Sequence, residues 1–121
     1  MANRNFNRYQ ALEKEIKSLY LDVAIGASGA PTLTKGLGVT SIVRNSAGDY
    51  TITLDDKYMR LMSCSIQQLS SSSVDLTFQL KAESVASAKT IEILSHAAAV
   101  ATDPANGTRL LIKIDLKNSS I

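Results

Sequence analysis

The chain offers few side chains that are suited to catalysis. His96 is the only histidine, which excludes a metal site of several histidines and a His–His acid–base pair. A Ser–His–Asp arrangement stays formally open because serines and aspartates are frequent. However, no Gly-x-Ser-x-Gly elbow is present and nothing ties a particular serine to His96. We therefore expect His96 to lie on the surface or at a strand end.

Cys64 is the only cysteine and could act as a nucleophile if its pKa were lowered. No neighbouring residue in the sequence would lower the pKa of Cys64. Met62 and Ile66 are predicted to share one apolar strand face with Cys64, and this environment favours the neutral thiol. The pattern predicts a structural thiol in a half-buried strand. A single cysteine also excludes a disulfide within the chain and favours a reducing compartment.

Asp55 and Asp56 are adjacent carboxylates, but neighbouring strand residues point to opposite faces and would not converge. We expect a short helix over residues 55–59, with Asp55 or Asp56 as its N-cap. No EF-hand pattern surrounds them.

The glycines between residues 26 and 38 match neither the dinucleotide fingerprint nor the P-loop. The sequence thus predicts no catalytic residue, no metal site and no cofactor site.

Residues 1–16 are predicted to form an extended N-terminal arm, which precedes one domain over residues 17–121. The arm is polar, with Phe6 and Tyr9 as isolated anchors between Arg4 and Arg8. Two acidic residues, Glu13 and Glu15, reduce the net basic charge of the arm. We therefore expect the two aromatic residues and the two arginines of the arm to bind a protein neighbour rather than nucleic acid. The arm has no apolar stretch of the kind found in a signal peptide.

The composition predicts a globular protein without a membrane helix. Of 121 residues, 45% are apolar, and no apolar run approaches the roughly 18 residues that a membrane helix needs. The formal net charge is +2, which is too balanced to argue for direct nucleic-acid binding. With no Trp and few aromatic residues, the core must be built from Val, Ile, Leu and Ala.

Alternating apolar residues separated by turn signals predict an all-β domain, either an antiparallel β-sandwich or a small barrel of about seven to eight short strands. Alternation marks strands over 17–25, 39–44, 50–54, 62–67, 76–80, 90–94 and 110–116, and a further one is open over 97–102. Residues 45–49 are predicted to form a hairpin loop with Gly48 in the left-handed region. Residues 103–107, Asp-Pro-Ala-Asn-Gly, predict a turn.

The inward positions of these strands define the expected core. Its members are apolar residues that alternate with polar ones: Leu21, Val23, Ile52, Leu54, Ile66, Leu76, Phe78, Ile112 and Ile114.

Four stretches resemble small virion proteins of tailed bacteriophages. They are MANRNFNRYQALEK at the start, VAIGASGAPTL, GVTSIVRNSAGDYTITLDDKYMRLM, and DPANGTRLLIKIDLKNSSI at the end. The first is similar to openings of the Met-Ala-Asn-Arg type, and the second to an Ile-Gly-Ala-x-Gly-Ala-Pro-Thr-Leu segment. Residues 62–95 match less well. These motifs consist of turn and strand residues and carry no catalytic group.

The resemblance implies a non-enzymatic virion structural protein, foremost a capsid decoration or cement protein that binds the major capsid protein. It also implies a homo-oligomer, with a trimer as the expected state, and residence in the virion after assembly in the bacterial cytoplasm. Three alternatives stay open: a tail or neck component, a host-surface or carbohydrate-binding module, and a hydrolase that uses His96.

Overall fold

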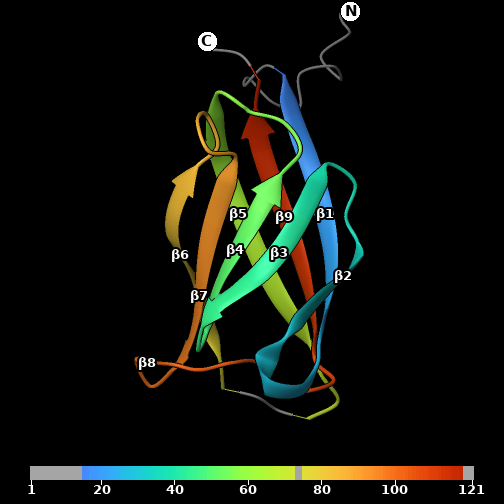
Figure 1. Cartoon of the computed structure of the whole chain (residues 1–121), viewed down its shortest axis with the longest axis vertical. Helices are drawn as coiled ribbons and strands as arrows, with labels where there is room; N and C mark the ends of the chain where they lie inside the picture. Colours follow the sequence, from blue (N-terminus) through green and yellow to red (C-terminus); the bar gives the residue numbers. More distant parts are fainter. Residues whose placement is uncertain (1–14, 73–74, 119–121) are drawn as a thin grey trace, which may run out of the picture.

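The computed structural model describes residues 15–72 and 75–118. Two antiparallel sheets pack against each other as a β-sandwich, with no α-helix in the described ranges (Figure 1). The strands are β1 (Ile16–Ile25), β2 (Pro31–Lys35), β3 (Val39–Ser46), β4 (Asp49–Leu54), β5 (Arg60–Leu69), β6 (Thr77–Ser84), β7 (Thr90–Ala97), β8 (Val100–Ala101) and β9 (Arg109–Lys117). A 3-10 turn, η2 (Ala27–Gly29), lies between β1 and β2.

The first sheet has the strand order β2-β1-β9-β5, and the second has the order β3-β4-β7-β6 with the short β8 added to β7. Hairpins join β1 to β2, β3 to β4, β6 to β7, and β7 to β8, whereas the remaining connections cross between the sheets. The predicted all-β sandwich is therefore confirmed. The strand β2 was not predicted, because its short Pro-Thr-Leu-Thr-Lys run lies between two glycine-containing loops.

The core lies between the inner faces of the two sheets. Strands β1, β4 and β9 bury alternate side chains along most of their length, as the pleat requires. Of the predicted core, the six residues on central strands are buried: Leu21, Val23, Ile52, Leu54, Ile112 and Ile114. Ile66, Leu76 and Phe78 are only half-buried, since they lie on or beside β5 and β6, which are edge strands.

The predicted hairpin and its left-handed Gly48 are confirmed, but the loop is shorter than the predicted residues 45–49. Strands β3 and β4 are joined through Ala47 and Gly48, and Gly48 has a φ of +70°. The Gly48 carbonyl accepts a hydrogen bond from Ser95 N of β7 at 2.7 Å, and the Gly48 amide donates to Asp103 Oδ1 at 2.8 Å. The turn over residues 103–107 is present as well, with Gly107 at a φ of +92°.

The predicted short helix over residues 55–59 is wrong. This segment crosses from one sheet to the other, and its amides donate to three separate parts of the chain: Asp55 N to Gly38 O, Tyr58 N to Val85 O, and Met59 N to Lys117 O. Asp55 is no N-cap, since its Oδ1 accepts a hydrogen bond from Thr40 Oγ1 at 2.6 Å. Long-range partners thus replace the local bonds of a helix.

Met62 does not share the inner face with Cys64 and Ile66 as predicted. The register of β5 against β9 shifts between Leu61 and Ser63, so an extra residue interrupts the alternation. Leu61 packs against the core instead, and 37% of Met62 is exposed.

Candidate partner-binding face

His96 and the neighbouring Ser95 each form a hydrogen bond with another part of the chain. His96, on β7, places Nε2 3.0 Å from Gln79 Oε1, while the neighbouring Ser95 hydroxyl donates to Thr102 O at 2.6 Å. In residues 15–72 and 75–118, no group of three or more His, Cys, Asp or Glu side chains is arranged to hold a metal ion. His96 and Ser95 thus bond to Gln79 and to Thr102 O.

Cys64 lies half-buried on the inner face of β5 and packs against the core. Burial, with a smaller contribution from the nearby Asp115 carboxylate, raises the pKa of the Cys64 thiol to about 11. The thiol is thus neutral near pH 7 and is a weak nucleophile. This geometry agrees with the structural role that its apolar neighbours predict.

The glycine-containing loops form a structural joint around Asp103. Arg44 donates to the Asp103 carboxylate from Nε at 3.0 Å and from Nη2 at 2.8 Å, and Gly48 N donates at 2.8 Å. The buried Tyr50 hydroxyl donates to Gly29 O at 2.7 Å. A Cβ on Gly29 would lie 2.5 Å from Asp103 Cγ, so only glycine fits there. The joint ties three loops together at one end of the sandwich.

An exposed site with an apolar centre lies on the outer surface of the first sheet, which we call the Tyr20 face. A hollow of about 390 Å³ opens there. Tyr20 is 63% exposed and Leu111 is 40% exposed, so the hollow presents apolar surface to solvent. The residues that line it are Tyr20, Leu21, Asp22, Lys35, Ser65, Gln67, Leu111, Ile112 and Lys113.

Strand register explains why these side chains meet. Lys113 of β9 pairs with Tyr20 of β1 on one side and with Ser65 of β5 on the other. One step along, Leu111 pairs in the same way with Asp22 and with Gln67. Since residues two apart on a strand share a face, both rows point outward beside each other. Three strands far apart in sequence therefore build one surface.

The carboxylates of the Tyr20 face are already satisfied. Arg109 donates to Asp22 from Nε to Oδ1 at 3.1 Å and from Nη2 to Oδ2, and this pairing lowers the pKa of Asp22. Asp115 accepts from the hydroxyls of Ser18 at 2.6 Å and Ser63 at 2.7 Å, which lowers its pKa. These acids are held in their charged form by partners within the chain.

The lysines of the face are less engaged than its acids. Lys113 Nζ lies 3.9 Å from Asp115 Oδ2, at the limit of an ion pair. Among residues 15–72 and 75–118, Lys35 forms no ion pair. The face is consequently apolar at its centre and carries cationic groups that remain available to an external anion.

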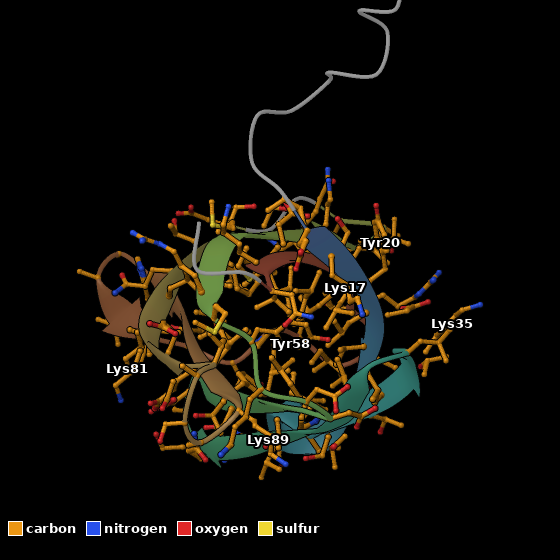
Figure 2. The ribbon with its side chains drawn as sticks, turned by 90° about the horizontal axis from the view of Figure 1, so that it is seen from above. Lys17, Tyr20, Lys35, Tyr58, Lys81 and Lys89 are labelled. Atoms are coloured by element: carbon orange, nitrogen blue, oxygen red, sulfur yellow. The ribbon has the colours of Figure 1, made fainter. Side chains whose placement is uncertain are left out.

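A second hollow of about 440 Å³ adjoins the first, shares Tyr20 and Lys35 with it, and adds Lys17 and Tyr58. Figure 2 shows Lys17, Tyr20 and Lys35 on the same side of the molecule, with Lys81 on the opposite side. Lys81 differs chemically because it pairs with Asp49 at 2.8 Å and with Glu92 at 3.3 Å. Lys17 and Lys35, which form no ion pair with another described residue, thus lie beside Tyr20.

Sequence reasoning missed the Tyr20 face. The signal was an aromatic side chain between Leu19 and Leu21, because strict alternation places position 20 on the outer side of that strand. Lys35 could not be placed, since its strand was not predicted. The predicted binding residues Arg4, Phe6, Arg8 and Tyr9 lie outside the described residues.

Comparison of the chain with protein-family models, with curated proteins and with solved structures finds no match. A separate search of the described ranges for membrane-crossing helices finds none of sufficient length and apolarity.

Proposed function

We propose that this chain is a non-enzymatic structural protein of a tailed-bacteriophage virion that decorates the capsid by binding the major capsid protein. The observation that carries the proposal is the Tyr20 face, an exposed apolar hollow bordered by available lysines. An aromatic centre with a polar rim is the composition of a protein-binding surface. The sequence resemblance supplies the kind of particle on which the partner is found.

Residues of the resembling stretches meet in the fold. Three of the four resembling stretches contribute to the Asp103 joint: Gly29 from the second, Arg44, Gly48 and Tyr50 from the third, and Asp103 from the fourth. A shared set of motifs is expected when it specifies one arrangement of loops.

The charges of the Tyr20 face indicate the chemistry of the partner. Lys35 and Lys113 favour a partner segment with Asp or Glu side chains, placed on either side of an apolar residue that contacts Tyr20. A capsid presents many equivalent copies of such a segment. An oligomer of the chain, for which we propose a trimer, would engage several copies at once, so modest single contacts would add up to stable attachment.

Co-sedimentation with capsids tests this proposal. Heads assembled without the protein are mixed with the purified chain, and we expect the wild type to sediment with them at a fixed ratio to the major capsid protein. Lys35→Glu/Lys113→Glu and Tyr20→Ala should each reduce binding by about tenfold or more, as loss of a central contact does.

Two matched variants control for effects on folding. Val43→Ala removes an exposed apolar side chain from β3 of the second sheet, and Lys89→Glu reverses a charge that lies apart from Tyr20 (Figure 2). Both should bind as the wild type does. Absence of the protein from purified virions would overturn the proposal. If electron micrographs of intact particles carrying the labelled protein showed the label only on the tail or neck, the chain would instead be a tail or neck component.

A carbohydrate-binding function is the second candidate, since one observation favours it. The exposed ring of Tyr20 lies in a hollow with Asp22 and Gln67, and stacking of a sugar on an aromatic ring beside polar groups is a common mode of recognition. A glycan array would show binding that Tyr20→Ala abolishes. An array without any signal would remove this candidate.

A further inference from the structure

One side of the sandwich is open between β5 and β6. These strands end the two sheets, and neither has a strand partner on its outer edge in the described part of the chain. On the opposite side, the short connection between β2 and β3 joins the sheets (Figure 1). An uncovered edge strand of ten residues is a site for pairing with another segment.

A groove follows this open side, and we call it the β5–β6 groove. Its lower part is a hollow of about 290 Å³ lined by Cys64, Ile66, Leu76, Thr77, Phe78, Gln79 and Leu80. Its upper part, of about 570 Å³, is lined by Met59–Leu61 and by Glu83–Ser87. Cys64, Ile66 and Phe78 pack against the core and still border the groove, so covering it would complete their burial.

The N-terminal arm begins within reach of this groove. Ile16 and Arg60 pair with the same residue of β9, Lys117, from opposite sides, so their strands start about 10 Å apart, which is two strand spacings. From Ile16 back to Phe6 the extended chain spans up to about 35 Å. Reaching Cys64 requires about 10 Å across β9 and about 13 Å along β5.

The arm also has the chemistry that the groove requires. It carries the aromatic residues Phe6 and Tyr9 for the apolar hollows, and Arg4 and Arg8 for charge. Asp75, next to Leu76, and Glu83, in the upper part, are both exposed and form no ion pair with another described residue. A tethered segment has an effective concentration in the millimolar range, which favours it over a free occupant.

We propose that residues 1–14 cover the β5–β6 groove of their own molecule, with Phe6 and Tyr9 against Cys64, Ile66 and Phe78. Because the arm joins the sandwich at the end where β5 begins, it runs antiparallel to β5 and adds to that edge. This differs from the docking on a neighbour that the sequence predicts, and it is independent of the Tyr20 face.

Cys64 is a built-in reporter for this proposal, since it is the only thiol and borders the groove. We expect a small maleimide to label Cys64 of the full-length Phe6→Ser/Tyr9→Ser variant at least about tenfold faster than wild type at the same pH. The control Asn5→Ser/Asn7→Ser should be labelled as slowly as wild type. Equal rates in all three proteins would overturn the proposal.

Two further measurements keep the result specific. The labelling rate of wild type should not change between about 1 and about 100 µM protein, because protection within one molecule is independent of concentration. Protection that grows with concentration would assign the arm to a neighbour and overturn the proposal. A photo-crosslinker in place of Phe6 should attach to β5 or β6 of the same chain. Attachment elsewhere would contradict the assignment, whether or not the protein binds capsids.

Discussion

At the residue scale, Asp103 has the widest influence on this fold. Its carboxylate accepts from Arg44 and from Gly48 N, and it lies against Gly29. The hydrogen bonds from Arg44 lower the pKa of Asp103 below its ordinary value of 3.8, against the opposing effect of burial. One ionised group therefore connects the β3–β4 hairpin, the loop after β1 and the turn before β9.

We expect Asp103→Asn to reduce the free energy of unfolding by about 2 kcal/mol at pH 7, because the charge-assisted bonds to Arg44 are lost. An acid with a depressed pKa in the folded state stabilises above its ordinary pKa, and this contribution is lost as the pH falls through the folded value. Wild-type stability should therefore decrease on acidification below about pH 4, and less so in the variant. Urea unfolding at several pH values measures both effects.

The exposed Asp56, which has no ion pair with a described residue, provides the control for this change. Asp56→Asn should leave the free energy of unfolding near the wild-type value. An acid profile of Asp103→Asn as steep as that of the wild type would contradict the assignment.

A comparison of substitutions at Gly48 and Gly107 distinguishes the cost of backbone strain from the cost of steric crowding. Both have positive φ, but a Cβ on Gly48 would lie 2.3 Å from Ser95 O, whereas one on Gly107 would have no atom within 4 Å. We expect Gly107→Ala to cost about 1 kcal/mol of stability and Gly48→Ala to cost clearly more, about 3 kcal/mol. Thermal or urea unfolding of both variants decides this, and equal losses would refute the crowding argument.

At the element scale, strand position decides how far an apolar side chain is buried. Ile112 on the central β9 and Ile66 on the edge strand β5 are cross-strand partners, yet Ile112 is fully buried and Ile66 is half-buried. The bulge after Leu61 adds a further difference, since it turns Met62 outward. Edge strands thus keep part of their inner face available to a covering segment.

The pair provides a matched measurement of this difference. Ile112→Ala should lower the free energy of unfolding by about 4 kcal/mol and Ile66→Ala by about 2 kcal/mol or less, because truncation costs more where surrounding atoms close off the cavity. Chemical denaturation of the two single variants measures both values. An equal or larger loss for Ile66→Ala would contradict the half-buried position of the Ile66 side chain on β5.

At the scale of the whole molecule, acidic and basic residues are nearly equal in number, but they differ in how far partners within the chain neutralise them. The net charge of the chain is only +2, yet the acids of the Tyr20 face are bound by Arg109, Ser18 and Ser63, while Lys35 has no ion pair in the described ranges. A nearly neutral protein can therefore present a basic face to its partner. Surface potential depends on which charges are neutralised nearby.

Binding to capsids should consequently weaken as salt increases. Between about 50 and about 500 mM NaCl the screening length falls several-fold, so the attraction between the Tyr20 face and partner carboxylates should decrease. We expect a clear loss of co-sedimenting wild-type protein and a much smaller salt effect for the residual binding of Lys35→Glu/Lys113→Glu. Lys89→Glu, whose charge lies apart from the Tyr20 face, should keep the wild-type salt dependence. Binding that is independent of salt would argue against an acidic partner segment.

Local alternation alone determined the fold class, most strands, the hairpin at Gly48 and the inward residues of the central strands. It did so because the two-residue period of a strand is a property of the chain itself. The prediction was wrong where contacts came from afar: residues 55–59 bond to Gly38, Val85 and Lys117 instead of forming a helix, and the bulge against β9 turns Met62 outward.

Only the tertiary structure decided where the exposed surfaces lie. The Tyr20 face requires β1, β5 and β9 to be neighbours, and the β5–β6 groove requires both strands to end their sheets. Strand order is set by pairing between distant segments, and no local period records it. The sequence by itself therefore determined which side of each strand is apolar, and the packing of the strands determined which polar sides meet, which acids are neutralised and which edges remain open.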